Sequence, residues 1–384
     1  MDLLAIKKFV ISTRTGIFLD AVLRLCLSII PFFHSLLPGW KREFKPKGFA
    51  FFLYGGIGDV IMILNLINAV ASHSKVYIFS DKKITNLGFL FPENAEVMIY
   101  DKSAFKKDIS VFREKLGPDI VFVQTSPVIE MYFVRQLLGI RYAAGMLVNF
   151  RALRSQNLKG KKERVTGVAK QGVYEQIYYY LSNIFGWNIK KEVFCKDGKS
   201  NINDLEGSNY LVMSVMKTSY WGMGKMEDAE YVKIAEHYIS KHNMKVVFVG
   251  DSKERCSIEK IILGSHFSKQ MINKAGTTSL QQLSVLLQDA RFVISNDNGI
   301  SHLASFLKIR VLVLFMFSDP EVYRWSGDFH QFLFNKKKSC MPCVGVNSFP
   351  KDNYPVKCRN SLACNSSISA SDVISKVEKL RWLI

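Results

Sequence analysis

The chain has few acidic residues for its size. It contains 33 Asp and Glu against 52 Lys and Arg, which gives a formal net charge of +19 over 384 residues. An excess of this size favours an anionic partner, such as an acidic membrane surface or a phosphorylated substrate, over a merely basic and solvated surface. Because the sequence lacks a ribonucleoprotein box and a basic helix repeat, we do not expect nucleic acid to be that partner.

The N-terminus also lacks a convincing cleavable secretory signal, so we expect a cytoplasmic protein in a reducing compartment. This bears on the cysteines, because four of the seven gather near the C-terminus with the spacing C-x2-C-x14-C-x5-C. The four are Cys340, Cys343, Cys358 and Cys364. In a reducing compartment this density favours a structural zinc or iron site over two disulfides, and reduced or redox-active thiols are the alternative.

Residues 1–48 differ in character from the rest of the chain. The stretch 16–37 is largely apolar and has basic residues on both sides, while Asp20, Arg24 and Ser28 follow one another at intervals of four. On a helix these three form one polar stripe, which predicts an amphipathic helix lying on a membrane surface. A membrane-spanning helix and packing against the protein itself or another subunit are the alternatives.

The rest of the chain alternates short apolar runs with segments of helical spacing. We expect strands at 49–54, 76–79, 120–123, 210–215, 245–249, 292–295 and 311–315, and helices at 60–71, 130–138, 228–241, 280–287, 301–306 and 371–383. This rhythm predicts an α/β protein with two Rossmann-like parallel-sheet domains. The domains are expected at 49–200 and 201–370, the second including the cysteine cluster 340–364, with a terminal helix at 371–384.

One glycine-rich turn follows the first expected strand. It contains Gly55, Gly56 and Gly58 and ends at Asp59. Glycines let the backbone turn tightly and approach a ligand, and a helix start offers unpaired amides. Asp59 is a candidate general base, with a helix N-cap as the equally simple alternative. A dinucleotide oxidoreductase is disfavoured because the third glycine of its G-x-G-x-x-G turn is missing.

A second turn, Ser295 to Ala304 (SNDNGISHLA), follows a strand in the other half of the chain. Together with GGIGDVIM at 55–62, VVFVGDSKE at 246–254, the block 275–307 and the Cys340-Met-Pro-Cys343 tail, it resembles glycosyltransferase family nine. These are the ADP-heptose-dependent heptosyltransferases of the lipopolysaccharide inner core. The resemblance extends over about residues 49 to 365.

The resemblance implies a GT-B arrangement, in which the first domain binds the acceptor and the second binds a nucleotide-sugar. It implies inversion of the anomeric centre in one displacement without a catalytic cofactor, with Asp59 as the base. The residues expected to bind the donor are Thr218, Ser219, Lys225, Asp297, Asn298, Gly299, Ile300 and His302. Among these, Lys225 and the amides of 298–300 would hold the diphosphate, Asp297 the sugar hydroxyls, and His302 would orient the loop or touch phosphate.

Two departures from the family pattern leave the donor's base and sugar open. Met226-Glu227-Asp228 follows Lys225 where Arg-Trp-Pro is common, and Asn298 replaces the usual Ser or Thr. The expected acceptor is an anionic glycolipid or surface glycan. A heptosyltransferase acting on a protein and a non-catalytic nucleotide-sugar-binding assembly protein are the alternatives.

Overall fold

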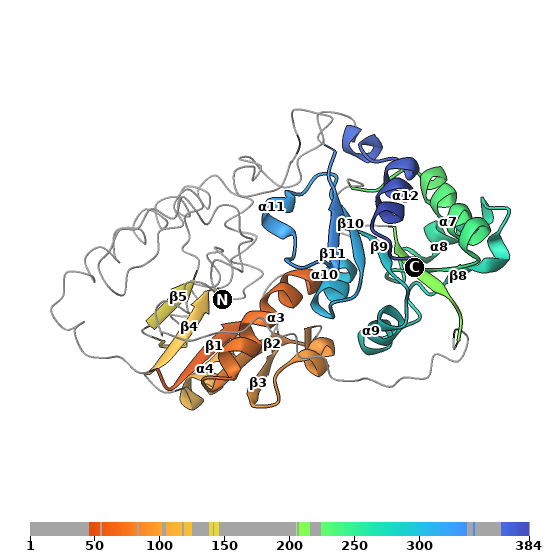
Figure 1. Cartoon of the computed structure of the whole chain (residues 1–384). Coiled ribbons are helices and arrows are strands. Elements are labelled where there is room, and N and C mark those ends of the chain that lie inside the picture. The colour runs from red at the N-terminus through yellow and green to blue at the C-terminus, as the bar shows by residue number, and fades with distance from the viewer. Residues whose placement is uncertain are drawn as a thin grey trace, which may run out of the picture. The chain divides into compact units, whose positions relative to one another are not determined.

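The computed structural model describes two units of the chain. The described residues are 46–53, 56–82, 84–101, 105–116, 119–124, 138–140, 142–145, 205, 207–215, 224–335, 341 and 362–383. The first unit lies within Met1–Gly55 and Ile63–Phe194, and the second within Gly56–Met62 and Cys195–Ile384. Each has its own parallel sheet (Figure 1).

The sheet of the first unit has five strands in the order β3-β2-β1-β4-β5, and every neighbouring pair is parallel. The strands are β1 (Gly48–Phe52), β2 (Val76–Asp81), β3 (Ala95–Tyr100), β4 (Ile120–Gln124) and β5 (Tyr142–Gly145). The helical elements are α3 (Ile57–Ala71), η2 (Ile84–Leu90) and α4 (Phe105–Lys115). All residues of β1 and β2 are buried, including Ser80 and Asp81 at the end of β2, as expected for inner strands of a parallel sheet.

The sheet of the second unit has six parallel strands in the order β11-β10-β9-β6-β7-β8. The strands are β6 (Tyr210–Ser214), β7 (Lys245–Val249), β8 (Met271–Asn273), β9 (Val293–Asn296), β10 (Val311–Leu314) and β11 (His330–Leu333). The helical elements are α7 (Asp228–His242), α8 (Arg255–Leu263), η4 (Ser268–Gln270), α9 (Leu280–Gln288), α10 (Gly299–Phe306), α11 (Pro320–Tyr323), η5 (Ala363–Ser366) and α12 (Ala370–Lys379).

Both sheets share one topology. Counted along the chain within each unit, the strand order is 3-2-1-4-5 in the first sheet and 3-2-1-4-5-6 in the second. The order reverses between β1 and β4 in one unit and between β6 and β9 in the other. In such sheets ligands bind outside the carboxyl ends of the strands at this reversal. The predicted α/β class and parallel sheets are therefore confirmed, and the topology directs attention to the turns after β1, β6 and β9.

Several helix boundaries differ from those predicted. The first helix begins at Ile57 instead of residue 60, because the Asp59 carboxylate accepts the Gly56 amide at 2.8 Å and so satisfies an N–H at the helix start. The last helix spans Ala370–Lys379 and ends before Arg381, which adopts a left-handed backbone conformation. The expected helix at 130–138 lies almost wholly outside the described residues.

Helix α12 packs within the second unit, against α7 and β11. Val373, Val377 and Trp382 belong to the same buried core as Tyr231 and Tyr238 of α7. The amide of Ala370, at the first turn of α12, donates to the Glu230 carboxylate near the start of α7 at 2.6 Å. The terminal helix is thus part of the second unit's core.

No helix in the described portion of the chain is long and apolar enough to cross a membrane. Residues 1–45, which contain nearly all of the predicted amphipathic extension, lie outside that portion.

Candidate functional site

The turn after β9 is held by an asparagine cap. Asn298 is the N-cap of α10, and its side-chain oxygen accepts the amides of Ile300 at 2.9 Å and Ser301 at 3.2 Å. The Ser301 hydroxyl oxygen in turn accepts the Asn298 amide at 3.1 Å, which completes a capping box. The Asn298 side-chain amide donates to Ser214 Oγ at 2.9 Å. Because Ser214 ends β6, the cap joins the two strands at which the sheet order reverses.

The same cap limits which amides can bind a ligand. Of the three amides predicted to cradle a diphosphate, those of Asn298 and Ile300 already donate within the capping box. The Gly299 amide has no acceptor among the described residues. An anion at this point would therefore meet the Gly299 amide and the positive end of the α10 dipole, and not three amides.

Asp297 is buried at the carboxyl end of β9, with 6% of its surface exposed. Its Oδ2 accepts the hydroxyl of Ser318, which follows β10, at 2.5 Å. Its Oδ1 lies 3.3 Å from Nε2 of His302 on α10. Both carboxylate oxygens are thus engaged by neighbouring elements, and Asp297 fastens the turn to the end of the next strand.

The proton position on His302 follows from its other neighbour. The indole N–H of Trp325 lies 3.0 Å from His302 Nδ1, and an indole nitrogen can only donate. Nδ1 must therefore be unprotonated, so the proton of the neutral ring is on Nε2, facing Asp297. In this arrangement His302 links Trp325 to Asp297.

A second buried histidine supports the other end of α10. Ser305 Oγ donates to the carbonyl of Ser301 at 2.8 Å, so it accepts from Nδ1 of His330 at 2.7 Å. His330 is the first residue of β11 and is 6% exposed. Burial lowers the pKa of His330 to about 3, so this ring is neutral near pH 7.

A buried polar cluster ties the loop before α7 to the same sheet edge. The Asn296 side-chain amide and the Tyr231 hydroxyl each donate to the carbonyl of Val215, just after β6, at 2.9 Å. The Tyr231 hydroxyl also accepts the amide of Met226 at 3.1 Å. Burial raises the pKa of Tyr231 above its ordinary value, so the hydroxyl stays a donor at all physiological pH values.

Lys225 lies in the loop that this cluster holds. The Asn365 side-chain oxygen accepts the amides of Gly224 at 2.9 Å and Lys225 at 3.4 Å. The Lys225 ammonium is 2.6 Å from the Asp228 carboxylate at the start of α7. Gly224 has a φ of +77°, and a Cβ there would lie 2.6 Å from the ring of Phe317. The loop therefore requires glycine at this position to place Lys225.

Asp59 is the third residue of α3 and is exposed. Its carboxylate accepts the Gly56 amide and so stabilises the start of α3. It does so from the third helical position and not as the N-cap, because Gly56 is the residue that precedes the helix. Exposure leaves the other carboxylate oxygen accessible to solvent or substrate. Thr218, Ser219 and Gly55 lie outside the described residues.

Comparison with known proteins finds relatives of the part of the chain that contains this site. A family model described as glycosyltransferase family 9 (heptosyltransferase) matches residues 202–352, which include the whole turn after β9. This part of the chain is similar to glycosyltransferase family 9. A curated relative, lipooligosaccharide heptosyltransferase 2 of Haemophilus ducreyi, is 38% identical over 79 residues, which are 20% of this chain and 22% of the relative. The matched region thus spans about a fifth of that relative's length.

Solved structures of family 9 extend the likeness of fold beyond that region. A family 9 glycosyltransferase from Veillonella parvula superposes with a TM-score of 0.65 at 16% identity, covering 88% of this chain and 98% of that one. The E. coli heptosyltransferase WaaC with ADP superposes with a TM-score of 0.60 at 13% identity, covering 87% and 99%. At these identities the likeness is one of fold.

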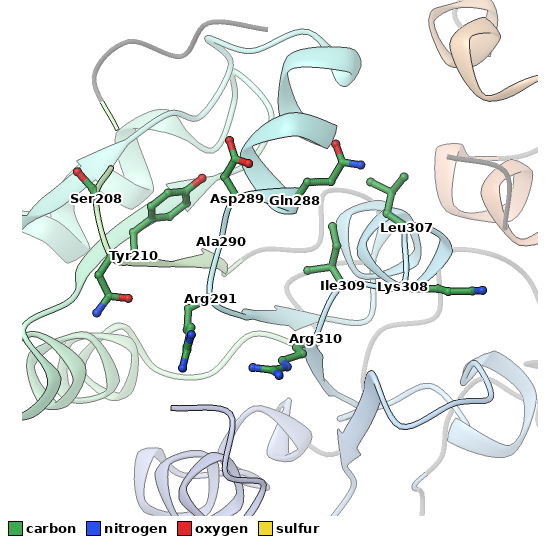
Figure 2. A pocket seen from close by; sticks show the side chains of 11 residues that line it. Ser208, Tyr210, Gln288, Asp289, Ala290, Arg291, Leu307, Lys308, Ile309 and Arg310 are labelled. Atoms are coloured by element: carbon green, nitrogen blue, oxygen red, sulfur yellow. The ribbon is translucent and has the colours of Figure 1, made fainter. Parts of the chain in front are cut away.

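A hollow of about 600 Å³ lies at the opposite edge of the second unit's sheet (Figure 2). Its lining includes residues just before β6, β9 and β10, at their amino ends. The two arginines in its lining, Arg291 and Arg310, donate to the carbonyl of Trp382 at 3.1 and 3.2 Å. The sheet topology directs attention to the carboxyl ends of the strands, so we do not assign the donor to this hollow.

Of the four clustered cysteines, only Cys364 lies among the described residues. It is 5% exposed in the core of the second unit, and its Sγ is 3.6 Å from the side-chain oxygen of Asn365. Cys340, Cys343 and Cys358 lie outside the described residues, so the metal site stays a prediction. What the structure adds is that the segment after the cluster supports the Lys225 loop through Asn365.

Proposed function

We propose that the protein is an inverting glycosyltransferase that moves a heptose, or a related sugar, from a nucleotide-sugar to a lipopolysaccharide core or related surface glycan. ADP-heptose is the first donor to test. The single observation that carries the proposal is the Asp297–Asn298 turn. It lies at the reversal of strand order, inside the region that matches family 9, and it is fastened to β6 and to Ser318 after β10.

The donor diphosphate is proposed to bind beside the start of α10. The Gly299 amide and the positive end of the helix dipole would face its oxygens, with Thr218 and Ser219 as additional hydroxyl contacts. Asp297 is proposed as an acceptor for sugar hydroxyls. It lies directly after β9, at the sheet edge where the topology predicts the ligand.

Lys225 is proposed as the cation that stabilises the leaving diphosphate. In the described state its ammonium pairs with Asp228, whose side chain is 47% exposed. Partly exposed ion pairs contribute only about 0–1 kcal/mol, so exchanging Asp228 for a diphosphate costs little. The backbone of the loop is fixed by Asn365 independently of that exchange.

Asp59 is proposed as the base that takes the proton from the attacking acceptor hydroxyl. Its carboxylate is exposed, so an acceptor hydroxyl can reach the oxygen that does not accept the Gly56 amide. The attacking oxygen would form its bond to the anomeric carbon as the bond to the diphosphate breaks, so the configuration inverts. No catalytic metal or other cofactor is part of this scheme.

The acceptor is proposed to be an anionic glycolipid at the cytoplasmic face of the inner membrane. The net charge of +19 would favour such a surface, and the predicted amphipathic extension would add an apolar contact.

Calorimetric titration with ADP, ADP-heptose and UDP tests the donor half of the proposal. Lys233→Met is the matched control for Lys225→Met. Each lysine forms an ion pair with a carboxylate three residues away, Lys225 with Asp228 and Lys233 with Glu230. Loss of a charge-assisted hydrogen bond of about 1.5–3 kcal/mol should weaken ADP binding about 10- to 150-fold in Lys225→Met only. Equal affinity in the two variants would remove Lys225 from the donor site.

A further inference from the structure

Three metal-ligating side chains meet far from the turn after β9. His237 and His242 lie on the last turns of α7, and Glu378 lies near the end of α12. Glu378 Oε1 is 3.0 Å from His237 Nε2 and 2.9 Å from His242 Nε2. One ligand atom from each of the three residues lies within 4.8 Å of the other two.

The two nitrogen–oxygen distances are close to those between ligand atoms of a metal site. Zinc binds imidazole nitrogen and carboxylate oxygen at roughly 2.0–2.2 Å, so tetrahedral ligand atoms stand roughly 3.3 Å apart. Glu378 Oε1 therefore needs to move by only a few tenths of an ångström from either nitrogen. All three side chains are half-buried, with 21% to 32% of their surface exposed, so an ion could enter from solvent.

The helices that carry these ligands are already aligned by other contacts. At the other end of the pair, the Ala370 amide donates to Glu230 at 2.6 Å, and Val373 and Val377 pack into the core shared with α7. The cluster is therefore preformed by the fold, which lowers the entropic cost of binding an ion. One further group belongs to it: the Lys241 ammonium is 3.5 Å from Glu378 Oε1.

We propose that His237, His242 and Glu378 bind a Zn²⁺ ion that clips the end of α12 to the end of α7. Two imidazoles and one carboxylate occupy three positions of a tetrahedral ion and leave the fourth for water. This ligand set differs from that of the predicted cysteine cluster, which would supply thiolates. Lys241 competes with the ion for the carboxylate, so its positive charge weakens the site.

The test uses the full-length protein, freed of metal by a chelator and then titrated with Co²⁺ and Zn²⁺. Cobalt separates the two ligand sets, because thiolate ligation produces intense near-ultraviolet charge-transfer bands and imidazole–carboxylate ligation does not. We expect one equivalent of cobalt without sulfur bands. In His237→Ala and Glu378→Gln this equivalent should bind more than about 100-fold more weakly. His266→Ala, which removes an exposed histidine of the same unit, should bind as the wild type does.

Lys241→Gln keeps the test decisive if a ligand variant does not fold. Removing the competing ammonium should tighten the sulfur-free site several-fold, and zinc should raise the melting temperature at least as much as in the wild type. The proposal is overturned if all bound cobalt shows sulfur bands. It is also overturned if the sulfur-free equivalent survives unchanged in folded His237→Ala and Glu378→Gln proteins.

Discussion

The buried His330 makes the stability of the second unit depend on pH. Its Nδ1–H donates to Ser305, while its Nε2 is buried with no partner among the described residues. A proton on Nε2 would have no acceptor, which agrees with the lowering of the His330 pKa from 6.5 to about 3. The folded protein therefore excludes a proton that the unfolded chain accepts.

The sign and size of the effect follow from proton linkage. Between pH 6.5 and pH 3 the unfolded chain binds a proton at His330 that the folded chain does not, so the free energy of unfolding falls as pH falls. The slope is about 1.4 kcal/mol per pH unit, which gives a loss of about 2 kcal/mol between pH 6.5 and pH 5. Above pH 6.5 both states are neutral and the contribution is constant.

His330→Asn removes this dependence while keeping a donor near the Nδ1 position for Ser305. The variant leaves a small void, so we expect it to be less stable than the wild type at pH 7.5. Urea unfolding, followed by circular dichroism at pH 7.5, 6 and 5, should show the gap between the two proteins shrinking by about 2 kcal/mol. His266→Asn, at an exposed histidine, is the control and should follow the wild type. A gap that does not change with pH would refute the reasoning.

Three further predictions concern single contacts. The Ala370 amide, and then Lys233, lower the pKa of Glu230 below 4.5, so Glu230→Gln should be less stable than the wild type at pH 7, and this difference in melting temperature should shrink as pH falls below 4.5. Gly224→Ala, which meets both a positive φ and the Phe317 ring, should weaken calorimetric ADP binding at least about tenfold without changing the circular dichroism spectrum. Trp325→Phe leaves the buried Nδ1 of His302 without its hydrogen-bond donor. The free energy of unfolding, measured in urea, should fall by about 1–3 kcal/mol. An unchanged value would mean that another group replaces the indole as donor.

The strands that the sequence predicted best are the fully buried ones. β1 and β10 are continuous apolar runs, and β6 is one up to its last residue, Ser214. All of their residues are buried, and each strand was expected from its sequence. The edge strand β3 was missed because its exposed positions hold the apolar residues Val97 and Ile99, so its alternating burial is not matched by alternating apolar and polar residues. β11 begins with a buried histidine and is otherwise half-buried, so its composition gave no signal either.

The candidate site was also predictable from the sequence only in part. The turn after β9 could be found from its local sequence, but its partners Ser214, Ser318 and Trp325 could not. They lie between 21 and 84 residues away along the chain, and only the parallel sheet brings them to the turn. Asn298, a departure from the family pattern, is in this chain the helix cap itself.

The same network changes the expected chemistry of the turn. A glycine-containing turn at a helix start suggests several unpaired amides, yet the capping box uses those of Asn298 and Ile300. We therefore propose that Lys225 and the helix dipole interact with most of the diphosphate charge. Sequence alone could not show this, because it does not reveal which backbone amides a side chain already satisfies.

Sugar transfer by Asp59→Asn is the measurement that tests the central proposal most directly. Wild-type protein and the variant are each incubated with ADP-heptose and heptose-deficient core lipopolysaccharide, and the mass of the product is determined by mass spectrometry. The affinity for ADP is measured for both proteins. We predict addition of one heptose by the wild type, and loss of transfer with unchanged ADP affinity in Asp59→Asn. Transfer by the variant at the wild-type rate would contradict Asp59 as the base. A wild-type protein that binds ADP but transfers no sugar from any nucleotide-sugar would contradict the enzymatic function itself.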